Sequence, residues 1–294
     1  MSVQSLVDAV ALGSVYALVA IGLALIFGVM RLVNFAHGEL ITAAAYTLYV
    51  ARDLPVPVII VLAIAVAVAM AWGMERFVFR WLRGVAPETT LIATFAVSIA
   101  LEAVWVIAFG VQGKSVSVLP GLNHLATHGS VTIRWVTLVE LAVGAVLLVG
   151  IIGFLNRTSI GLQMRAAAAD FRAARLIGVR ADRVISMAFV ISGVLAAAVA
   201  ILLTVSEPLV TPTLGLEITI LALVGIVVGG MNRLLTATAG GFAIGFANSL
   251  LGAVLPSSQR VFLPSAVFLL VIIVLLIRPE GIFASRRHSA VDRV

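Results

Sequence analysis

The chain has 294 residues, of which 62% are hydrophobic and 11% charged, and its mean hydropathy is +1.21. This composition lies far outside the range of soluble domains and predicts a polytopic membrane protein. The net charge of +6 comes without a soluble basic patch with interleaved aromatic residues, which argues against nucleic-acid binding, and the absence of cysteine excludes disulfides and zinc-thiolate sites.

Apolar runs recur along the whole chain and predict an all-α bundle of eight or nine transmembrane helices in a single domain, 1–294. The uncharged or nearly uncharged runs are 9–30, 40–51, 54–74, 89–110, 141–155, 184–206, 218–232, 234–259 and 261–277. The second and seventh runs are shorter than the roughly 20 residues that a full crossing needs. Tilted, broken or re-entrant helices are therefore expected at these two places.

A polar cluster follows the first run, which is uncharged over 22 residues. Asn34, His37 and Glu39 lie where lipid offers no hydrogen-bond partner, and such groups usually line a path or a helix contact. On one continuous helix, His37 and Glu39 would point roughly 60° and 140° away from Asn34. An interruption, which Gly38 permits, would bring them to a half-helix junction on a translocation path. The alternative is a polar network that holds the first two spans together.

Basic residues predict the orientation of the bundle. With nine crossings and the N-terminus outside, most of the 19 Lys and Arg residues fall on the inner side, and the C-terminus is cytoplasmic. Residues 111–135, which contain Pro120-Gly121 and Val116-Ser-Val118, then form an external loop with some strand character.

The segment 156–184 is predicted to lie on the cytoplasmic face. It carries a helix-forming run from Met164 to Arg175 and then Gly178, a residue suited to a helix C-terminus. Its six arginines have a simple explanation as a belt that touches anionic lipid headgroups. The run itself predicts a short amphipathic helix laid on the cytoplasmic face.

Glycines dominate the later spans. Gly225-x-x-x-Gly229 and Gly241-x-x-x-Gly245 each place two small residues on one helix face, where another backbone can approach closely. We expect these four glycines to form close helix contacts.

Several stretches together resemble the branched-chain amino acid ABC permeases, of the H-type subunit, from about residue 5 to residue 284. The resemblance rests on Gly22-Leu-Ala-Leu-Ile-Phe-Gly28-Val-Met-Arg31-Leu-Val-Asn34-Phe-Ala-His37-Gly38-Glu39, on Gly161-Leu-Gln-Met-Arg-Ala, on Leu176-Ile-Gly178-Val-Arg-Ala-Asp182-Arg183-Val184, and on Arg278-Pro-Glu-Gly-Ile-Phe283.

The resemblance implies a permease subunit of an ATP-driven importer in the bacterial inner membrane. It implies that the chain is not itself an enzyme and needs no cofactor or metal. The implied partners are a second homologous permease, two ABC ATPase subunits, a periplasmic solute-binding protein and membrane lipid, with branched-chain amino acids as the solute. The family docks a coupling helix, often marked Glu-Ala-Ala-x-x-x-Gly, on its ATPase. Arg172-Ala173-Ala174-x-x-x-Gly178 has this spacing, with arginine in place of the acidic residue.

Other functions and other solutes stay open. An ion-coupled secondary transporter would need Glu102 or Glu140 as a proton carrier, and an intramembrane enzyme would need a nucleophile or metal cluster that the sequence hardly offers. No Lys or Arg lies centrally in a span, which favours a neutral or zwitterionic solute. A related branch carries urea or short amides, and the unusual stretch 231–233 keeps that alternative open.

Overall fold

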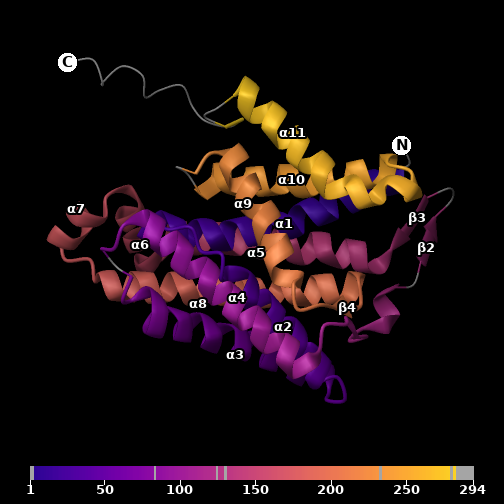
Figure 1. Ribbon diagram of the computed structural model, residues 1–294, viewed down its shortest axis with the longest axis horizontal. Helices are drawn as coiled ribbons and strands as arrows, with labels where there is room; N and C mark the ends of the chain where they lie inside the picture. Colours follow the sequence, from indigo (N-terminus) through magenta and orange to yellow (C-terminus); the bar gives the residue numbers. More distant parts are fainter. Residues whose placement is uncertain are drawn as a thin grey trace.

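Long apolar helices run between two ends of the molecule in the computed structural model (Figure 1), which describes residues 3–82, 84–123, 125–128, 131–231, 234–278 and 281–282. Within these ranges, seven helical segments are long and apolar enough to cross a membrane. They contain α1 (Val3–Met30), α3 (Val56–Met74), α4 (Pro87–Phe109), α5 (Trp135–Arg157), α8 (Ala181–Ser206), α10 (Leu234–Val254) and α11 (Leu263–Ile277).

Two shorter helices lie among the long ones. Helix α2 (His37–Val50) has 14 residues and α9 (Leu214–Gly229) has 16, and both are shorter than a full crossing of about 20 residues. They correspond to the second and seventh apolar runs, where tilted, broken or re-entrant helices are expected from the sequence. A non-helical stretch precedes each one: 31–36 before α2, and 207–213, with its short strand, before α9.

The two ends of the bundle carry different elements (Figure 1). The N-terminus shares one end with an antiparallel hairpin of β2 (Leu125–His128) and β3 (Val131–Arg134). This end, called the hairpin end below, also holds the pairing of β1 (Lys114–Ser115) with β4 (Leu209–Val210). The strand character predicted for 111–135 is thus confirmed. The opposite end holds α6 (Ser159–Ala169) and α7 (Phe171–Leu176). Short 3-10 helical turns lie at Pro120–Asn123 and Ser257–Phe262.

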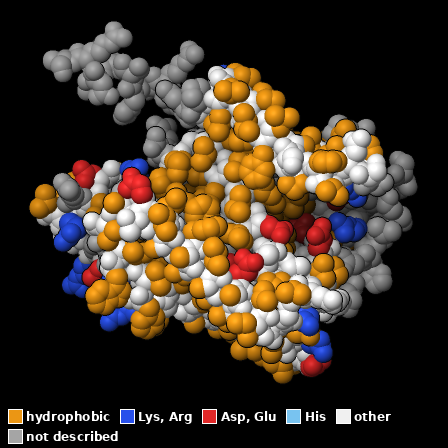
Figure 2. All heavy atoms as spheres, in the orientation of Figure 1, with side chains coloured by type: hydrophobic (Ala, Val, Ile, Leu, Met, Phe, Trp, Pro, Cys, Tyr) orange, Lys and Arg blue, Asp and Glu red, His pale blue; other side chains and the backbone are white. Residues whose placement is uncertain are grey.

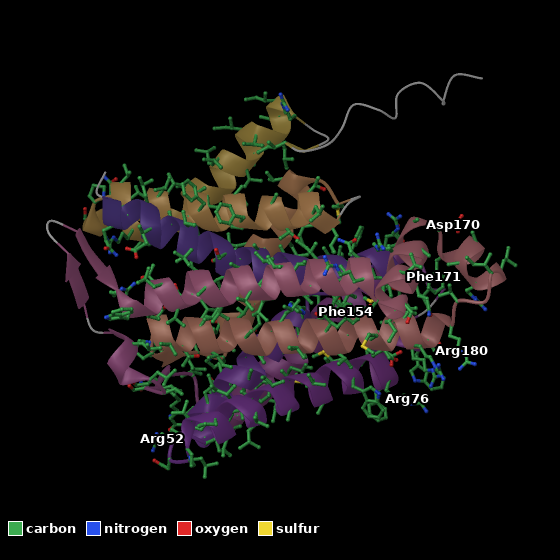
Figure 3. The ribbon with its side chains drawn as sticks, turned by 180° about the vertical axis from the view of Figure 1, so that it is seen from behind. Arg52, Arg76, Phe154, Asp170, Phe171 and Arg180 are labelled. Atoms are coloured by element: carbon green, nitrogen blue, oxygen red, sulfur yellow. The ribbon has the colours of Figure 1, made fainter. Side chains whose placement is uncertain are left out.

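The apolar and basic side chains are distributed as a bilayer requires. Figure 2 shows apolar side chains over the middle of one face, with Lys and Arg gathered toward the two ends. From the other side, Figure 3 shows Arg76 and Arg180 at the α6–α7 end and Arg52 at the hairpin end. Arginines at both boundaries of an apolar middle are typical of membrane helices.

Helix α4 has an apolar exposed face and a polar buried face. Thr90, Thr94 and Ser98 are fully buried, whereas large apolar residues such as Ile92 and Ile107 are exposed. Residues four apart share a helix face, so the three hydroxyls form one stripe directed at the rest of the protein. In lipid, such a stripe fastens a helix through hydrogen bonds, because apolar contacts give no preference over lipid.

Glycine contacts set the spacing of the helices around α1. A Cβ on Gly225 would lie 2.7 Å from the Cα of Gly241, and a Cβ on Gly229 would lie 2.9 Å from the Cα of Gly240, so α9 and α10 touch through their backbones. A Cβ on Gly241 would overlap that of Ala20, and one on Gly245 would lie 2.8 Å from the Leu12 carbonyl oxygen. The first predicted pair therefore faces α10, and the second faces α1.

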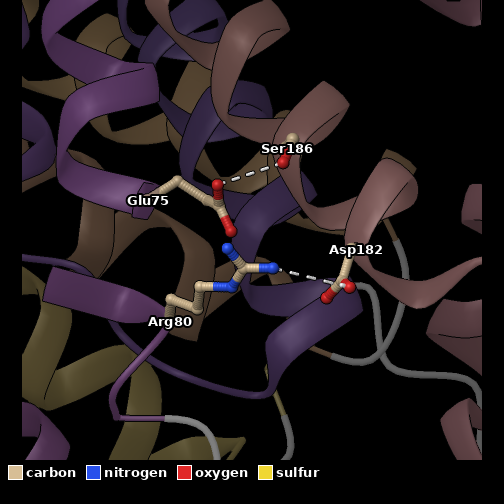
Figure 4. Close-up of polar contacts among 4 residues, drawn as sticks. All are labelled: Glu75, Arg80, Asp182 and Ser186. Carbon is tan, nitrogen blue, oxygen red and sulfur yellow. Dashed lines mark hydrogen bonds and ion pairs between the residues drawn. The ribbon is translucent and has the colours of Figure 1, made fainter. Parts of the chain in front are cut away.

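Polar contacts also join α3 to α8 (Figure 4). The π-helical turn Glu75–Phe79 extends α3, and the buried Glu75 carboxylate accepts a hydrogen bond of 3.0 Å from Ser186 Oγ. Arg80, just beyond this turn, lies 3.8 Å from the Asp182 carboxylate. These contacts fix the distance between the two helices at the α6–α7 end.

Candidate functional site

The segment 31–36 turns back into the bundle after α1 ends. Two contacts with α4 hold it: Thr94 Oγ1 lies 3.3 Å from the Val33 carbonyl oxygen and 3.5 Å from the Phe35 amide nitrogen. The ring of His37, the first residue of α2, packs on Gly22, since a Cβ there would lie 3.2 Å from His37 Cε1. Gly22 precedes the end of α1 by about 12 Å along the helix axis. Helix α2 therefore begins inside the bundle.

The interruption of the first two spans is thus six residues long and lies ahead of Gly38. Gly38 itself sits in the first turn of α2 and has a different role, because its backbone meets that of Gly215 in α9. A Cβ on Gly215 would overlap the Gly38 carbonyl group, and Thr42 Oγ1 accepts a hydrogen bond of 3.1 Å from the Gly215 amide. The N-termini of the two short helices therefore meet in the interior.

His37 joins α2 to α8. Its side chain is fully buried, and Nδ1 shares a hydrogen bond of 2.9 Å with Ser192 Oγ. Its Nε2 atom has no hydrogen-bond partner among the described residues. Packed between α1 and α8, the ring fixes the point at which α2 begins.

Glu39 joins α2 to α4 instead. Its carboxylate is fully buried and accepts two hydrogen bonds, from Ser98 Oγ at 2.9 Å and from Trp105 Nε1 at 2.8 Å. Both donors lie on α4, whose remaining surface is mostly exposed. Glu39 therefore anchors α4 at two points, Ser98 and Trp105.

Asn34 differs from its two neighbours. Its side chain is 1% exposed, and within the described part of the chain neither its amide oxygen nor its amide nitrogen has a hydrogen-bond partner. The three side chains thus have different surroundings. His37 is hydrogen-bonded to α8 and Glu39 to α4, whereas Asn34 has no hydrogen-bond partner among the described residues. The structure does not bring them together as one binding site.

A cavity of about 600 Å³ lies between α2, α3 and α4, where α4 leads into β1. Aromatic residues form one wall, in which the Tyr46 ring stacks on Phe109 at 4.0 Å and Trp105 stands beside them. Because the Trp105 indole also holds Glu39, a shift of α4 would alter the cavity and the anchor together.

The segment between α5 and α8 forms two helices where the sequence predicted one. Asp170 interrupts the run in an extended conformation (φ −149°, ψ 107°), and its Oδ1 accepts a hydrogen bond of 2.9 Å from the Ala173 amide. Asp is a strong N-cap residue, so it begins α7 rather than continuing α6. Gly178 follows α7 with φ +90°, the left-handed conformation that glycine tolerates at a helix C-terminus.

The residues of the coupling motif do not all face outward. Ala174 is buried at 3% exposure, whereas Ala173 and Gly178 are exposed. Leu176 and Ile177, which are not among the residues predicted for the coupling contact, are 89% and 78% exposed. The backbone of Arg172 lies in α7, and its side chain is outside the described part of the structure.

The two acids considered as proton carriers differ. Glu140 is 7% exposed and accepts a hydrogen bond from Ser206 Oγ, so it joins α5 to α8. Glu102 is half-buried on α4. In the described ranges, no group of three His, Cys, Asp or Glu residues could hold a metal ion.

Sequence reasoning missed the partners of the polar cluster, namely Thr94, Ser98, Trp105 and Ser192. One signal was present: Thr90, Thr94 and Ser98 recur every fourth residue in an otherwise apolar run, which indicates a polar helix face. Nothing in the sequence indicated that Ser192, which is 155 positions away, pairs with His37.

Known proteins resemble the chain along most of its length. The family described as branched-chain amino acid transport system / permease component matches residues 5–277. The high-affinity branched-chain amino acid transport system permease protein BraD of Pseudomonas aeruginosa is 31% identical, over 95% of this chain and 94% of that protein. LivH of Escherichia coli K12, which has the same description, is 29% identical with the same coverage. The solved structure of PsaBC from Streptococcus pneumoniae in complex with Fab is 18% identical, covers 93% of this chain and 89% of that one, and has a TM-score of 0.49.

Proposed function

Because the chain belongs to the family of branched-chain amino acid transport permeases, we propose that it forms, with a second homologous permease, the path of an ATP-driven importer. It is a multi-pass protein of the bacterial inner membrane and a transport component rather than an enzyme. In the proposed complex, two separate ATPase subunits hydrolyse ATP, and a solute-binding protein delivers branched-chain amino acids.

The exposed apolar tip of the α6–α7 segment carries this proposal. Leu176 and Ile177 are large, apolar and adjacent, and both are more than three-quarters exposed beside Arg175 and Arg180. Exposed apolar surface rimmed by polar residues is typical of protein or membrane contacts, and here it lies at the polar end of the bundle. We place the ATPase contact on this tip, so that Ala173 and Gly178 border it while Ala174 supports it from inside.

This placement fixes the orientation. If α7 meets a cytoplasmic ATPase, the α6–α7 end with segment 156–184 is cytoplasmic, and the hairpin end with loop 111–135 faces the periplasm. Arg76 and Arg180 then lie on the inner side, as the positive-inside rule favours.

Replacing Leu176 and Ile177 together by serine should reduce ATPase recruitment at least tenfold, because an apolar contact of this kind contributes on the order of 1.5–3 kcal/mol per large side chain. The measurement is co-purification of the ATPases with the tagged permease in detergent. Leu162→Ser is the matched control, since Leu162 is 60% exposed on α6, outside the tip. Unchanged recruitment by the double variant would assign the tip to lipid instead.

For the solute path we propose Asn34, the residue of the cluster whose amide is not bonded to a described neighbour. His37 and Glu39 would border the path as structural anchors. The solute is the one named for the relatives, a branched-chain amino acid. The stretch that keeps a urea or amide alternative open includes Asn232 and Arg233, which lie outside the described residues.

Asn34→Ala should change solute preference while the melting temperature of the complex stays near that of the wild type, because no bonded partner is stranded. His37→Ala should lower stability first, by about 1–3 kcal/mol, since Ser192 loses its buried partner. Uptake of leucine in competition with valine and urea, together with a melt in detergent, checks both. A destabilised Asn34→Ala with wild-type solute preference would move Asn34 into the structural network.

A further inference from the structure

One arginine joins the end of α1 to the α6–α7 segment. Arg31 Nη2 donates a hydrogen bond of 3.0 Å to the carbonyl oxygen of Ala168, near the end of α6. The two backbones are also close here, since a Cβ on Gly28 would lie 3.5 Å from that of Ala168. The last carbonyls of a helix lack partners within the helix, and a cation is favourable beside them. The guanidinium of Arg31 is therefore a favourable hydrogen-bond donor to the last turn of α6.

The backbone at Arg31 is unusual. Among the described residues it is the one non-glycine residue with positive φ, at 55°, and its amide donates a hydrogen bond of 2.7 Å to the Phe27 carbonyl. This geometry ends a helix, and glycine normally occupies the position. A non-glycine residue held there costs about 1–3 kcal/mol, and such residues cluster in switch regions. Arginine at this position brings a side-chain contact that glycine would lack.

The chain that follows Arg31 leads directly to the interior. Residues 31–36 connect it to the start of α2, and on the way Val33 and Phe35 contact Thr94 of α4. Beyond this contact, His37 is bonded to α8 and Glu39 to α4. A displacement of Ala168 therefore acts on both the short helix and α4 through a single non-helical segment.

We propose that Arg31 is the coupling residue that transmits movement of the α6–α7 segment to the interior start of α2. This inference rests on the proposed function, because it assumes that an ATPase moves α7. The Arg31 contact adjoins the junction of the two helices, because Ala168 lies two residues before Asp170, where α6 ends and α7 begins. Arg31 acts through the segment 31–36 and not by touching the solute.

The test uses the whole importer in proteoliposomes, with ATP hydrolysis and leucine uptake measured together. In Arg31→Asn, the asparagine tolerates the positive φ at this position, but its shorter side chain cannot reach the carbonyl oxygen of Ala168. The ATPases should still co-purify, while leucine uptake per ATP falls at least about fivefold, the lower end of typical coupling energies. Arg31→Gly, which relieves the backbone strain, should uncouple equally and keep the complex folded. Arg157→Asn, at the same end of the bundle, is the matched control and should behave as wild type.

A second readout uses the absence of native cysteine. A single Val33→Cys should be labelled by a thiol reagent at a rate that changes when ATP is added, and Arg31→Asn should abolish that change. Uptake per ATP within twofold of wild type in both Arg31 variants, or an ATP-dependent labelling change that survives Arg31→Asn, would overturn the proposal. Failure of the wild-type chain to bind ATPases would instead overturn the proposed function, so the two failures are distinct.

Discussion

Alanine at Gly215 should prevent α2 and α9 from packing, with a loss of more than about 3 kcal/mol of folding free energy. The new methyl group would overlap the carbonyl group of Gly38, which belongs to the backbone and cannot rotate away. Relief would require the two short helices to separate, and the hydrogen bond from the Gly215 amide to Thr42 would then break. The measurement is the yield and thermal melt of the purified permease in detergent.

Gly150→Ala is the matched control for this experiment. Gly150 lies in the long helix α5, and a Cβ there would meet nothing within 4 Å. Alanine is also the better helix former by about 1 kcal/mol, so this variant should melt at or above the wild-type temperature. Equal melting of Gly215→Ala and Gly150→Ala would show that the two short helices do not cross through their backbones.

Removing the Glu39 carboxylate should release α4. In Glu39→Ala, Ser98 and the Trp105 indole lose their acceptor inside the protein, at a cost of about 1–3 kcal/mol for each stranded donor. Ser98 can turn to a carbonyl of its own helix, but the indole has no such choice. Helix α4 is otherwise mostly exposed, so we expect faster proteolysis of its flanking loops as well as a lower melting temperature.

Glu102→Ala supplies the control. Glu102 is an acidic residue of α4 itself, but it is only half-buried. A rescue makes the prediction sharper: Trp105→Phe combined with Glu39→Leu removes donor and acceptor together, and such paired replacements are often nearly neutral. Should Glu39→Ala melt like Glu102→Ala, or should the double variant melt below Glu39→Ala, the anchoring role would be wrong.

Much of the fold followed from local features of the sequence. Apolar run length alone predicted that α2 and α9 are short, since hydrocarbon thickness sets the length of a crossing helix. Gly225 and Gly241 were recognisable because close helix approach in lipid depends on small residues at four-residue spacing. These signals are local, because each can be recognised within a single segment of the sequence.

The remaining features depend on contacts between distant segments. Gly38 seemed to permit a break, but its role is set by Gly215, which no local pattern links to it. The helix predicted to reach Arg175 is broken at Asp170, because capping competed successfully with a strong alanine-rich helix signal. The outward face of α7 could not be predicted either, since burial of Ala174 depends on how the short helix packs against its neighbours.

The meeting of Gly38 with Gly215 also has an electrostatic consequence. Each α-helix carries the equivalent of about half a positive charge at its N-terminus. Two such ends converge here in a low-dielectric interior, although no span places a Lys or Arg at its centre. Helix α2 has the buried Glu39 in its first turn, where a carboxylate is favourable, whereas the first-turn Glu217 of α9 is exposed. The two helix N-termini thus favour oxygen-rich groups at the point where they meet.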